Sequence, residues 1–304
     1  MNSPASRDGA LLMLRKALLL ARRVPGFARL VNPIRRRYAR KSRLVTVTDF
    51  DGDLTLRLAL EERLQSQIFW YGYCNRDICA VLRRLLKPGM TVVDAGANIG
   101  EVTLVAAKAV GPEGRVFAFE PIQRIADHLE QHVQLNRLAQ IRVVRCALAD
   151  KADRKPIFKA AARFYDGSIH DGLGTLYSTA ERSIASEEVL LNTLDAFVGE
   201  AEVRRVDLVK IDVEGAELAV LRGSAATLTR FKPHLIIEVQ EDTARAAGYR
   251  AVDILNFLKP MGYGFHVIGR NGRLRPVDES SLGRFQNVLC SPRARAANGS
   301  EQRQ

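Results

Sequence analysis

The stretch from Thr91 to Gly100 constrains the fold of this chain more than any other part of the sequence. An apolar run with β-branched residues, 91–93, predicts a buried strand, and small residues follow it from Asp94 onward. Apolar residues then recur at helical spacing from Val102. The pattern predicts a strand, a tight turn and a helix, an arrangement in which the free N–H groups of the helix face a bound ligand.

The small residues of this turn form a candidate nucleotide-binding loop. Gly96 and Gly100 lack a Cβ, so the backbone can adopt unusual dihedral angles and a ligand can approach the main chain closely. Ala97 and Asn98 lie between the two glycines, and Asp94 adds a carboxylate at the end of the strand. We expect these five residues to contact a cofactor.

A second short strand, predicted over 116–119, ends in Glu120 and Pro121, twenty residues after the loop. In a doubly wound sheet this strand lies beside the first, so Glu120 can accept hydrogen bonds from the two hydroxyls of a ribose. Both NAD and S-adenosylmethionine carry such a ribose. The loop 96–100 lacks the middle glycine of the Gly-x-Gly-x-x-Gly pattern of dinucleotide sites, which favours the methyl donor.

The third strand, predicted over 141–146, is followed by further candidate cofactor contacts. Ala147 and Leu148 are apolar residues placed to flank an adenine ring, and Asp150 can accept a hydrogen bond from its amino group. The crevice beyond the strand ends is where doubly wound folds hold their ligands. These residues extend the predicted cofactor site.

Acidic residues also follow the later strands. A fourth strand, predicted over 206–211, ends in Asp212 and Glu214, and a fifth, over 235–239, carries Glu238 near its end. Because the carboxyl ends of parallel strands meet at one edge of a sheet, we expect these acids on the same side as the glycine loop.

The fold class predicted from this order is α/β, with a doubly wound, seven-stranded, Rossmann-like sheet. The last two strands, 263–268 and 285–290, are joined by a hairpin link at Asn271-Gly272 and are expected to pair antiparallel. An N-terminal extension precedes the sheet, with a helix over 10–24 and a hairpin around Asp51-Gly52. We predict a basic arm over 1–43, a hairpin and helix over 44–86, the main domain over 87–292 and a disordered tail over 293–304.

Histidines offer few candidate functional groups. His170 lies in a glycine-rich, polar stretch expected to form a loop over the site, where it is either a pocket residue or an ordinary loop residue. His128 and His132 stand four apart on a predicted helix, but no third ligand accompanies them, and we expect both at the surface. We therefore predict no protein-ligated metal from histidine or cysteine spacing.

The net charge of +12 is concentrated near the N-terminus. Residues 1–43 carry twelve bases and one acid, whereas residues 44–304 carry 34 bases and 33 acids. A nearly neutral body gives no support for a nucleic-acid groove. The helix over 10–24 has an apolar surface broken by Arg15 and Lys16 and is too short to span a membrane. It therefore either lies on an anionic membrane surface or packs on the main domain. Four scattered cysteines favour a reducing compartment, and we expect a cytoplasmic protein with possible peripheral membrane contact.

Together these motifs resemble those of the FkbM-type S-adenosylmethionine-dependent methyltransferases. The resemblance covers about residues 68–268. In order, the matching motifs are Lys87-Pro88-Gly89, Val93 to Glu101, Ala118 to Pro121, Thr193-Leu194-Asp195, Lys210 to Glu217 and Leu221-Arg222-Gly223. One departure is Cys74, where the family often has a glutamate, so the role of that acid is in doubt here.

The resemblance implies a class I methyltransferase sheet and methyl transfer to oxygen, commonly on a sugar hydroxyl of a glycan, a lipid-linked saccharide or a secondary metabolite. The protein then has to align the hydroxyl with the donor, and a base removes its proton. Asp212 is the first candidate, followed by Glu214, Glu238 and His170. Alternatively, the three carboxylates bind a divalent cation, which we do not favour.

Two other classes of function compete with this interpretation. A nicotinamide-dependent oxidoreductase would share Glu120 and the strand-helix-strand unit, but the glycine triplet is absent. A non-catalytic adaptor for membranes or nucleic acids would use the basic arm, but it leaves the intact nucleotide loop unexplained. We therefore expect a small-molecule or saccharide acceptor and no nucleic acid partner.

Overall fold

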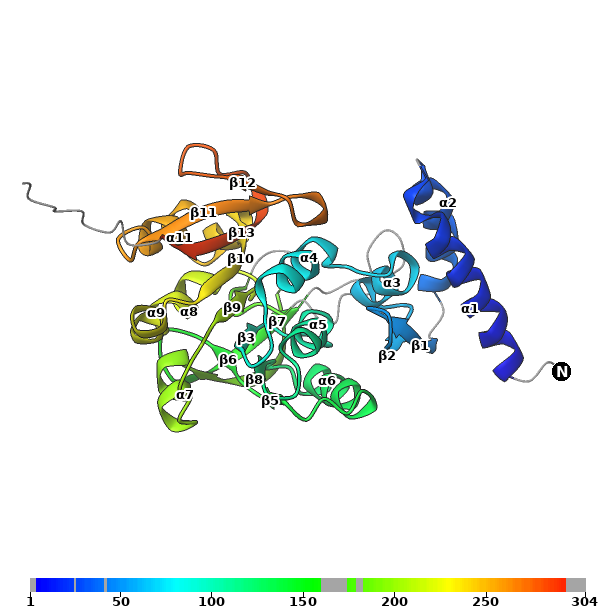
Figure 1. Cartoon of the computed structure of the whole chain (residues 1–304), viewed down its shortest axis with the longest axis horizontal. Coiled ribbons are helices and arrows are strands. Elements are labelled where there is room, and N and C mark those ends of the chain that lie inside the picture. Colours follow the sequence, from blue (N-terminus) through cyan, green and yellow to red (C-terminus); the bar gives the residue numbers. More distant parts are fainter. Residues whose placement is uncertain (1–3, 25, 41–42, 160–173, 179–182, 294–304) are drawn as a thin grey trace, which may run out of the picture.

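A mixed sheet of eight strands lies at the centre of the part of the chain that the structure describes (Figure 1). This structure is a computed structural model, and it describes residues 4–24, 26–40, 43–159, 174–178 and 183–293. The strands pair in the order β12-β11-β13-β10-β9-β3-β4-β5. They are β3 (Thr91–Ala95), β4 (Arg115–Phe119), β5 (Ile141–Val144), β9 (Leu208–Ile211), β10 (His234–Gln240), β11 (Tyr263–Ile268), β12 (Leu274–Pro276) and β13 (Phe285–Pro292).

The predicted doubly wound order is confirmed. From β10 to β5 every pair of neighbouring strands is parallel, whereas β13 runs antiparallel to both β10 and β11. The Asn271-Gly272 link leads first to β12, which pairs with β11 and adds an eighth strand at the edge of the expected seven. The short run 274–276 was not recognised because it is exposed and has no apolar alternation.

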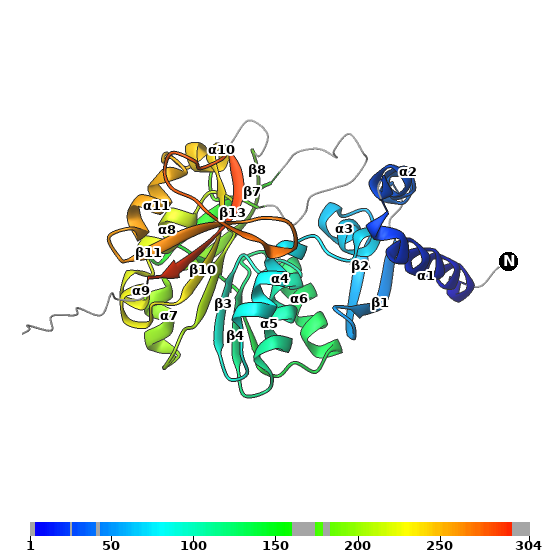
Figure 2. The ribbon, with the colours of Figure 1, turned by 45° about the horizontal axis from the view of Figure 1, so that its top comes forward.

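Helices cover both faces of the sheet (Figure 2). One face carries α4 (Arg76–Leu85), α5 (Glu101–Val110) and α6 (Gln123–Leu135), and the other carries α7 (Leu194–Glu200), α8 (Glu217–Arg222), α9 (Ala225–Phe231) and α11 (Val252–Leu258). Successive side chains of a strand point to opposite faces, so Val92 joins one apolar core and Val93 the other. A short helix, α10 (Glu241–Ala246), follows β10 directly. Burial on both faces explains why the central strands are continuous apolar runs.

A second, three-stranded sheet is formed by the insertion between the third and fourth central strands. It contains β6 (Ala147–Leu148), β8 (Ile184–Asn192) and β7 (Asp153–Lys159), paired in that order. Thr193 follows β8 and caps α7, because its side chain accepts a hydrogen bond from the backbone N–H of Ala196. His170 lies outside the described residues, as does the predicted tail beyond Arg293.

The N-terminal extension packs against the rest of the chain. It comprises α1 (Pro4–Leu20), the 3₁₀ turn η1 (Ala21–Arg23), α2 (Phe27–Ala39), β1 (Leu44–Phe50), β2 (Leu54–Ala59) and α3 (Arg63–Tyr71). The expected hairpin is present as β1 and β2. Leu11 and Leu18 of α1 and Val31 of α2 are buried in the same core as α3. No helix among the described residues is long and apolar enough to cross a membrane.

A buried arginine fixes α1 in place. The Arg15 side chain is only 2% exposed, and its Nε donates to the carbonyl oxygen of Phe69 at 2.9 Å. One terminal nitrogen donates to both carboxylate oxygens of Asp49, at 2.6 and 2.7 Å. The sequence pattern suggested that Arg15 interrupts an apolar surface, but the ion pair and the backbone contact allow it to be buried.

Helix α6 packs along the edge of the hairpin through His132. The prediction that His132 lies at the surface is wrong. His132 is fully buried, and its Nε2 accepts a hydrogen bond from the backbone N–H of Arg57 at 2.9 Å. Its Nδ1 then donates to the carbonyl oxygen of Ile99 at 2.8 Å. Burial and the nearby His128 lower the pKa of His132 to about 4, so the ring stays neutral and bridges β2 to the glycine loop.

We predict that Arg15→Ala lowers the free energy of unfolding by about 2–3 kcal/mol, because the carbonyl of Phe69 and the carboxylate of Asp49 lose a charged donor. Chemical denaturation of the full chain measures this loss. Lys16→Ala is the matched control, since Lys16 is the exposed neighbour on the same helix and should change stability by less than about 0.5 kcal/mol. Equal stability of both variants would contradict the assigned role of Arg15.

Candidate active site

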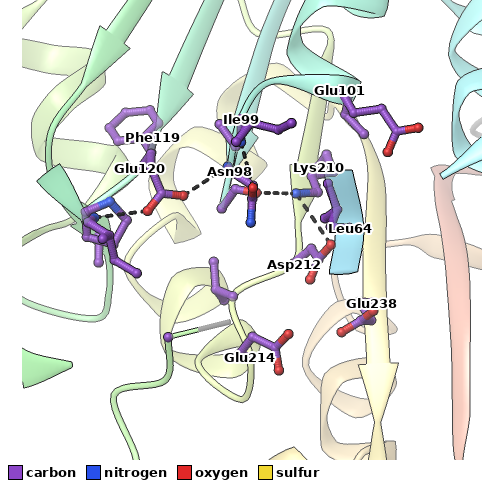
Figure 3. A pocket seen from close by; sticks show the side chains of 18 of the residues that line it. Leu64, Asn98, Ile99, Glu101, Phe119, Glu120, Lys210, Asp212, Glu214 and Glu238 are labelled. Atoms are coloured by element: carbon purple, nitrogen blue, oxygen red, sulfur yellow. Dashed lines mark hydrogen bonds and ion pairs between the residues drawn. The ribbon is translucent and has the colours of Figure 1, made fainter. Parts of the chain in front are cut away.

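A pocket opens at the carboxyl ends of β3, β4, β9 and β10 (Figure 3). Ten of the predicted site residues line it: Gly96, Ala97, Asn98, Glu120, Pro121, Ala147, Leu148, Asp212, Glu214 and Glu238. Three do not, namely Asp94, Gly100 and Asp150. Figure 3 shows Glu120 on one side of the pocket and the acids from β9 and β10 on the other. The strand ends thus bring together residues that lie far apart in sequence, as expected of a doubly wound sheet.

Glu120 is nearly buried and fixes the loop that faces it. One carboxylate oxygen accepts from the backbone N–H of Asn98 at 2.9 Å, and the other accepts from that of Ile122 at 3.0 Å. Burial raises the pKa of Glu120 to about 7, although the two backbone donors oppose the shift. A carboxylate offers about four lone-pair sites, so acceptor capacity remains for hydroxyl groups of a ligand.

Packing within the protein, and not contact with a ligand, excludes a side chain at position 96. Gly96 has a φ of +75°, and a Cβ there would lie 1.9 Å from the carbonyl oxygen of Asp212. Gly100 has a φ of +96°, and a Cβ there would lie 2.4 Å from a methyl carbon of Leu129 on α6. The two glycines therefore let the loop pack against β9 and α6. Gly100 itself faces α6 and does not line the pocket, so its predicted contact with the cofactor stays a prediction.

Asp94 also lies beneath the loop and not in the pocket. Its carboxylate is fully buried, where it accepts a hydrogen bond from Thr103 Oγ1 at 2.6 Å and an ion pair from Lys210 Nζ at 3.2 Å. Position at a strand end suggested a ligand contact, but β3 directs this residue into the protein. Asp150 is exposed and does not line the pocket, so its predicted contact with adenine stays a prediction.

Lys210 is a central site residue to which the sequence pattern gave no role. Its Nζ donates to the carbonyl oxygen of Gly96 at 2.7 Å and lies 3.6 Å from a carboxylate oxygen of Asp212. Burial alone would lower the pKa of Lys210, but the carboxylates of Asp94 and Asp212 outweigh it and raise the pKa. The charged ammonium therefore joins the ends of β3 and β9 and positions Asp212.

Three carboxylates meet on the far side of the pocket. Oxygen atoms of Asp212, Glu214 and Glu238 lie within 4.8 Å of one another. Burial and the negative charges of the other two raise the pKa of Glu238 well above its usual range. Glu217 fixes the backbone on either side of Glu214, because its carboxylate accepts hydrogen bonds from the N–H groups of Val213 and Gly215, at 3.2 and 3.1 Å. The cluster can accept a proton or bind a cation that prefers oxygen ligands.

Glu101 is a second pocket residue without a predicted role. It is buried, and it accepts hydrogen bonds from the backbone N–H groups of Cys74 and Asn75, at 2.7 and 3.1 Å. Burial raises its pKa to about 7. The carboxylate holds the turn that carries Cys74 against the pocket, and its place at the start of α5, directly after the glycine loop, was the available signal.

Comparisons with known proteins agree with this geometry. The family model for the methyltransferase FkbM domain matches residues 94–265. The chain is similar to the AMB antimetabolite synthetase AmbE of Pseudomonas aeruginosa, with 30% identity over 261 residues, covering 71% of this chain and 12% of that protein. It is 28% identical to the 2-O-methyltransferase NoeI of Sinorhizobium fredii over 51% of this chain and 65% of the relative. It is 29% identical to the 31-O-demethyl-FK506 methyltransferase FkbM of Streptomyces tacrolimicus, over 68% of this chain and 84% of the relative.

Among solved structures, the chain is similar to a methyltransferase FkbM from Methylobacillus flagellatus. The TM-score is 0.42 at 17% identity, and the match covers 75% of this chain and 52% of that one. The chain therefore spans only part of several relatives, from 12% of AmbE to 65% of NoeI.

We predict that Gly96→Ala destabilises the fold by about 2–5 kcal/mol, because left-handed strain of about 1–2 kcal/mol adds to overpacking against Asp212 of about 1–3 kcal/mol. Gly89→Ala is the control, since Gly89 has a similar φ of +81° with nothing within 4 Å of its added Cβ. Urea denaturation of both variants separates strain from collision. If the two variants lose the same stability, the close approach of Asp212 does not require glycine.

Proposed function

Because this chain belongs to the FkbM family of methyltransferases, we propose that it transfers a methyl group from S-adenosylmethionine to a hydroxyl oxygen of a small-molecule or saccharide acceptor. The observation that carries the proposal is one pocket with a buried carboxylate at the end of β4 and a cluster of carboxylates at the ends of β9 and β10. Two of the relatives are named as O-methyltransferases, which supports oxygen as the acceptor atom.

The residues at the end of β4 fit the methyl donor. Glu120 retains acceptor sites for the two ribose hydroxyls, and the loop 96–98 presents main chain to the ligand beside it. The apolar side chains of Phe119 and Leu148 line the same pocket and suit a flat adenine ring. Because Asp150 does not line the pocket, we expect the adenine ring to be held by these apolar contacts.

When bound, S-adenosylmethionine supplies an electrophilic methyl group on a positively charged sulfur. The protein has to orient the acceptor hydroxyl, exclude water and take up the hydroxyl proton. We propose that Asp212 accepts the hydroxyl proton. Lys210 holds this carboxylate at the end of β9, where it lines the pocket. Glu214 adds negative charge near the reacting groups, which favours a positively charged donor, whereas the raised pKa of Glu238 keeps that group protonated.

A second candidate role for the same carboxylates is to hold a divalent cation. Asp212, Glu214 and Glu238 each offer an oxygen ligand within the reach of one ion, and hard cations prefer such ligands. A cation bound there would lower the pKa of the acceptor hydroxyl. We favour the base, because the charged Lys210 ammonium already pairs with Asp212 and would repel a cation placed beside it.

We predict that Glu120→Gln weakens S-adenosylmethionine binding by about 1–3 kcal/mol, because the ribose hydroxyls lose a charged acceptor. Calorimetric titration of the full chain measures the affinity. Asp150→Asn should bind the donor normally, since Asp150 does not line the pocket.

The wild type should bind S-adenosylmethionine more weakly as pH falls from about 8 to about 6, because Glu120 has a pKa of about 7 and gains a proton in this range. Glu120→Gln should lack this pH dependence, and normal affinity in that variant would remove Glu120 from the ribose site.

We predict that Asp212→Asn lowers turnover by roughly 10²- to 10⁴-fold with little change in donor affinity, if Asp212 acts as a general base. Transfer of labelled methyl groups into cell extracts measures turnover, and donor titration measures affinity. A chelator should leave wild-type turnover unchanged under this mechanism. Loss of activity with chelator and its restoration by magnesium or manganese would instead support the cation. Near-normal turnover by Asp212→Asn would refute both roles.

A further inference from the structure

A second cavity lies beside the methyl-transfer pocket, between the N-terminal helices and the link that follows β11. Six arginines line it: Arg22, Arg29, Arg35, Arg76, Arg270 and Arg273. The first three belong to η1 and α2, and Arg76 begins α4. Arg270 and Arg273 belong to the short helix η2 (Arg270–Gly272) and the residue that follows it, so segments far apart in sequence form the cavity. Figure 2 shows the link between β11 and β12, in orange, beside α4. We call this cavity the arginine cleft.

The arginine cleft has a strong excess of positive charge. Among the described residues that line it, Asp77 is the only acidic one, and one of its oxygens already accepts a hydrogen bond from the backbone N–H of Asn271 at 2.7 Å. Among the described residues no salt bridge pairs Arg22, Arg270 or Arg273 with a carboxylate. Like charges repel when they are brought together, so this lining is complementary to an anion.

Two of the guanidinium groups converge on one point. A Cβ built on Gly72 would lie 3.6 Å from a terminal nitrogen of Arg22 and 3.6 Å from one of Arg76. Arg76 is held there by a hydrogen bond from its Nη2 to the carbonyl oxygen of Tyr71 at 2.6 Å and by its position over the Tyr73 ring, 5.2 Å from the centroid. Burial and the charge of Arg22 lower the pKa of Arg76. The two guanidinium groups are therefore held close together.

The arginine cleft adjoins the methyl-transfer pocket. Gln67 and Cys74 belong to the lining of both. These two side chains contact each other, with Cys74 Sγ 2.9 Å from Gln67 Oε1. Glu101 holds the backbone of Cys74 from the pocket side. The two cavities therefore meet at Gln67 and Cys74.

We propose that the arginine cleft binds a phosphate or diphosphate group of the acceptor, so that the methylated molecule is a phosphate-bearing hydroxyl compound. Guanidinium groups form bidentate hydrogen bonds with phosphate, and several arginines together match a multiply charged group better than a single carboxylate. This inference rests on the proposed methyl transfer. The phosphate belongs either to a soluble phosphate ester or to a lipid-linked diphosphate.

Titration of the full-length protein with inorganic pyrophosphate at moderate ionic strength tests the cleft directly. Arg22→Gln with Arg29→Gln should weaken binding at least about tenfold, because two charged donors are lost. The matched control is Arg37→Gln with Arg40→Gln, which removes the same charge from exposed positions of the same N-terminal segment outside the cleft lining. The control should bind within about twofold of the wild type. Equal weakening in both double variants, or no binding by the wild type, would overturn the proposal.

The affinity for S-adenosylmethionine, measured on the same samples, separates this proposal from the proposed function. All three proteins should bind the donor equally, since Arg22 and Arg29 do not line its pocket. A wild type that binds pyrophosphate but not the donor would refute the proposed function and leave the cleft as an anion site. A wild type that binds the donor but not pyrophosphate would refute only the cleft.

Labelled methyl transfer into cell extracts identifies the source of the phosphate. Label in the aqueous phosphate-ester fraction indicates a soluble acceptor. Label in the organic phase indicates a lipid-linked acceptor if mild acid, which cleaves the diphosphate, separates the labelled group from the lipid. Either result supports the proposal if the cleft double variant incorporates less label than the Arg37 and Arg40 control. Label confined to products without phosphate would overturn it.

Discussion

A buried ammonium group organises the centre of this molecule. Lys210 joins the carbonyl of Gly96, the carboxylate of Asp94 and the carboxylate of Asp212, which belong to the ends of the neighbouring strands β3 and β9 and to the glycine loop that follows β3. Taking these charges out of water is costly unless each has a partner. Because the ammonium lies between two carboxylates and donates to main chain, the ends of β3 and β9 are held at one spacing. The same spacing brings the carbonyl of Asp212 against Gly96 and excludes any side chain there.

The arrangement of the sheet was largely predictable, since buried parallel strands are apolar runs and their ends carry the residues that act on a ligand. Glu120, Asp212, Glu214 and Glu238 were identified because acids directly after such runs have few structural explanations. The position of the loop 96–98 was predictable for a similar reason. What the sequence could not provide was the direction of each side chain: Asp94 also stands at a strand end, yet the alternation of β3 directs it inward to Lys210.

Several polar residues were misjudged because their partners are remote in sequence. His132 is fixed by the backbone of Arg57 and Ile99, at separations of 75 and 33 residues, and Arg15 by Asp49 and Phe69. A local pattern shows such residues only as polar interruptions of apolar faces and therefore suggests exposure. Edge strand β12 was missed for the opposite reason, because its exposed residues form no pattern at all.

The arginine cleft is lined by residues from 22–35, 67–77 and 270–273, whereas the residues assigned to the methyl donor lie between 96 and 148. If the acceptor binds in the cleft as proposed, substitutions in the cleft segments would alter which molecule is accepted while the donor residues remain intact. Such a separation along the chain would let acceptor preference change at little cost to the methyl-transfer chemistry. It would also offer protein engineers short segments in which to recombine sequences when a new acceptor is wanted.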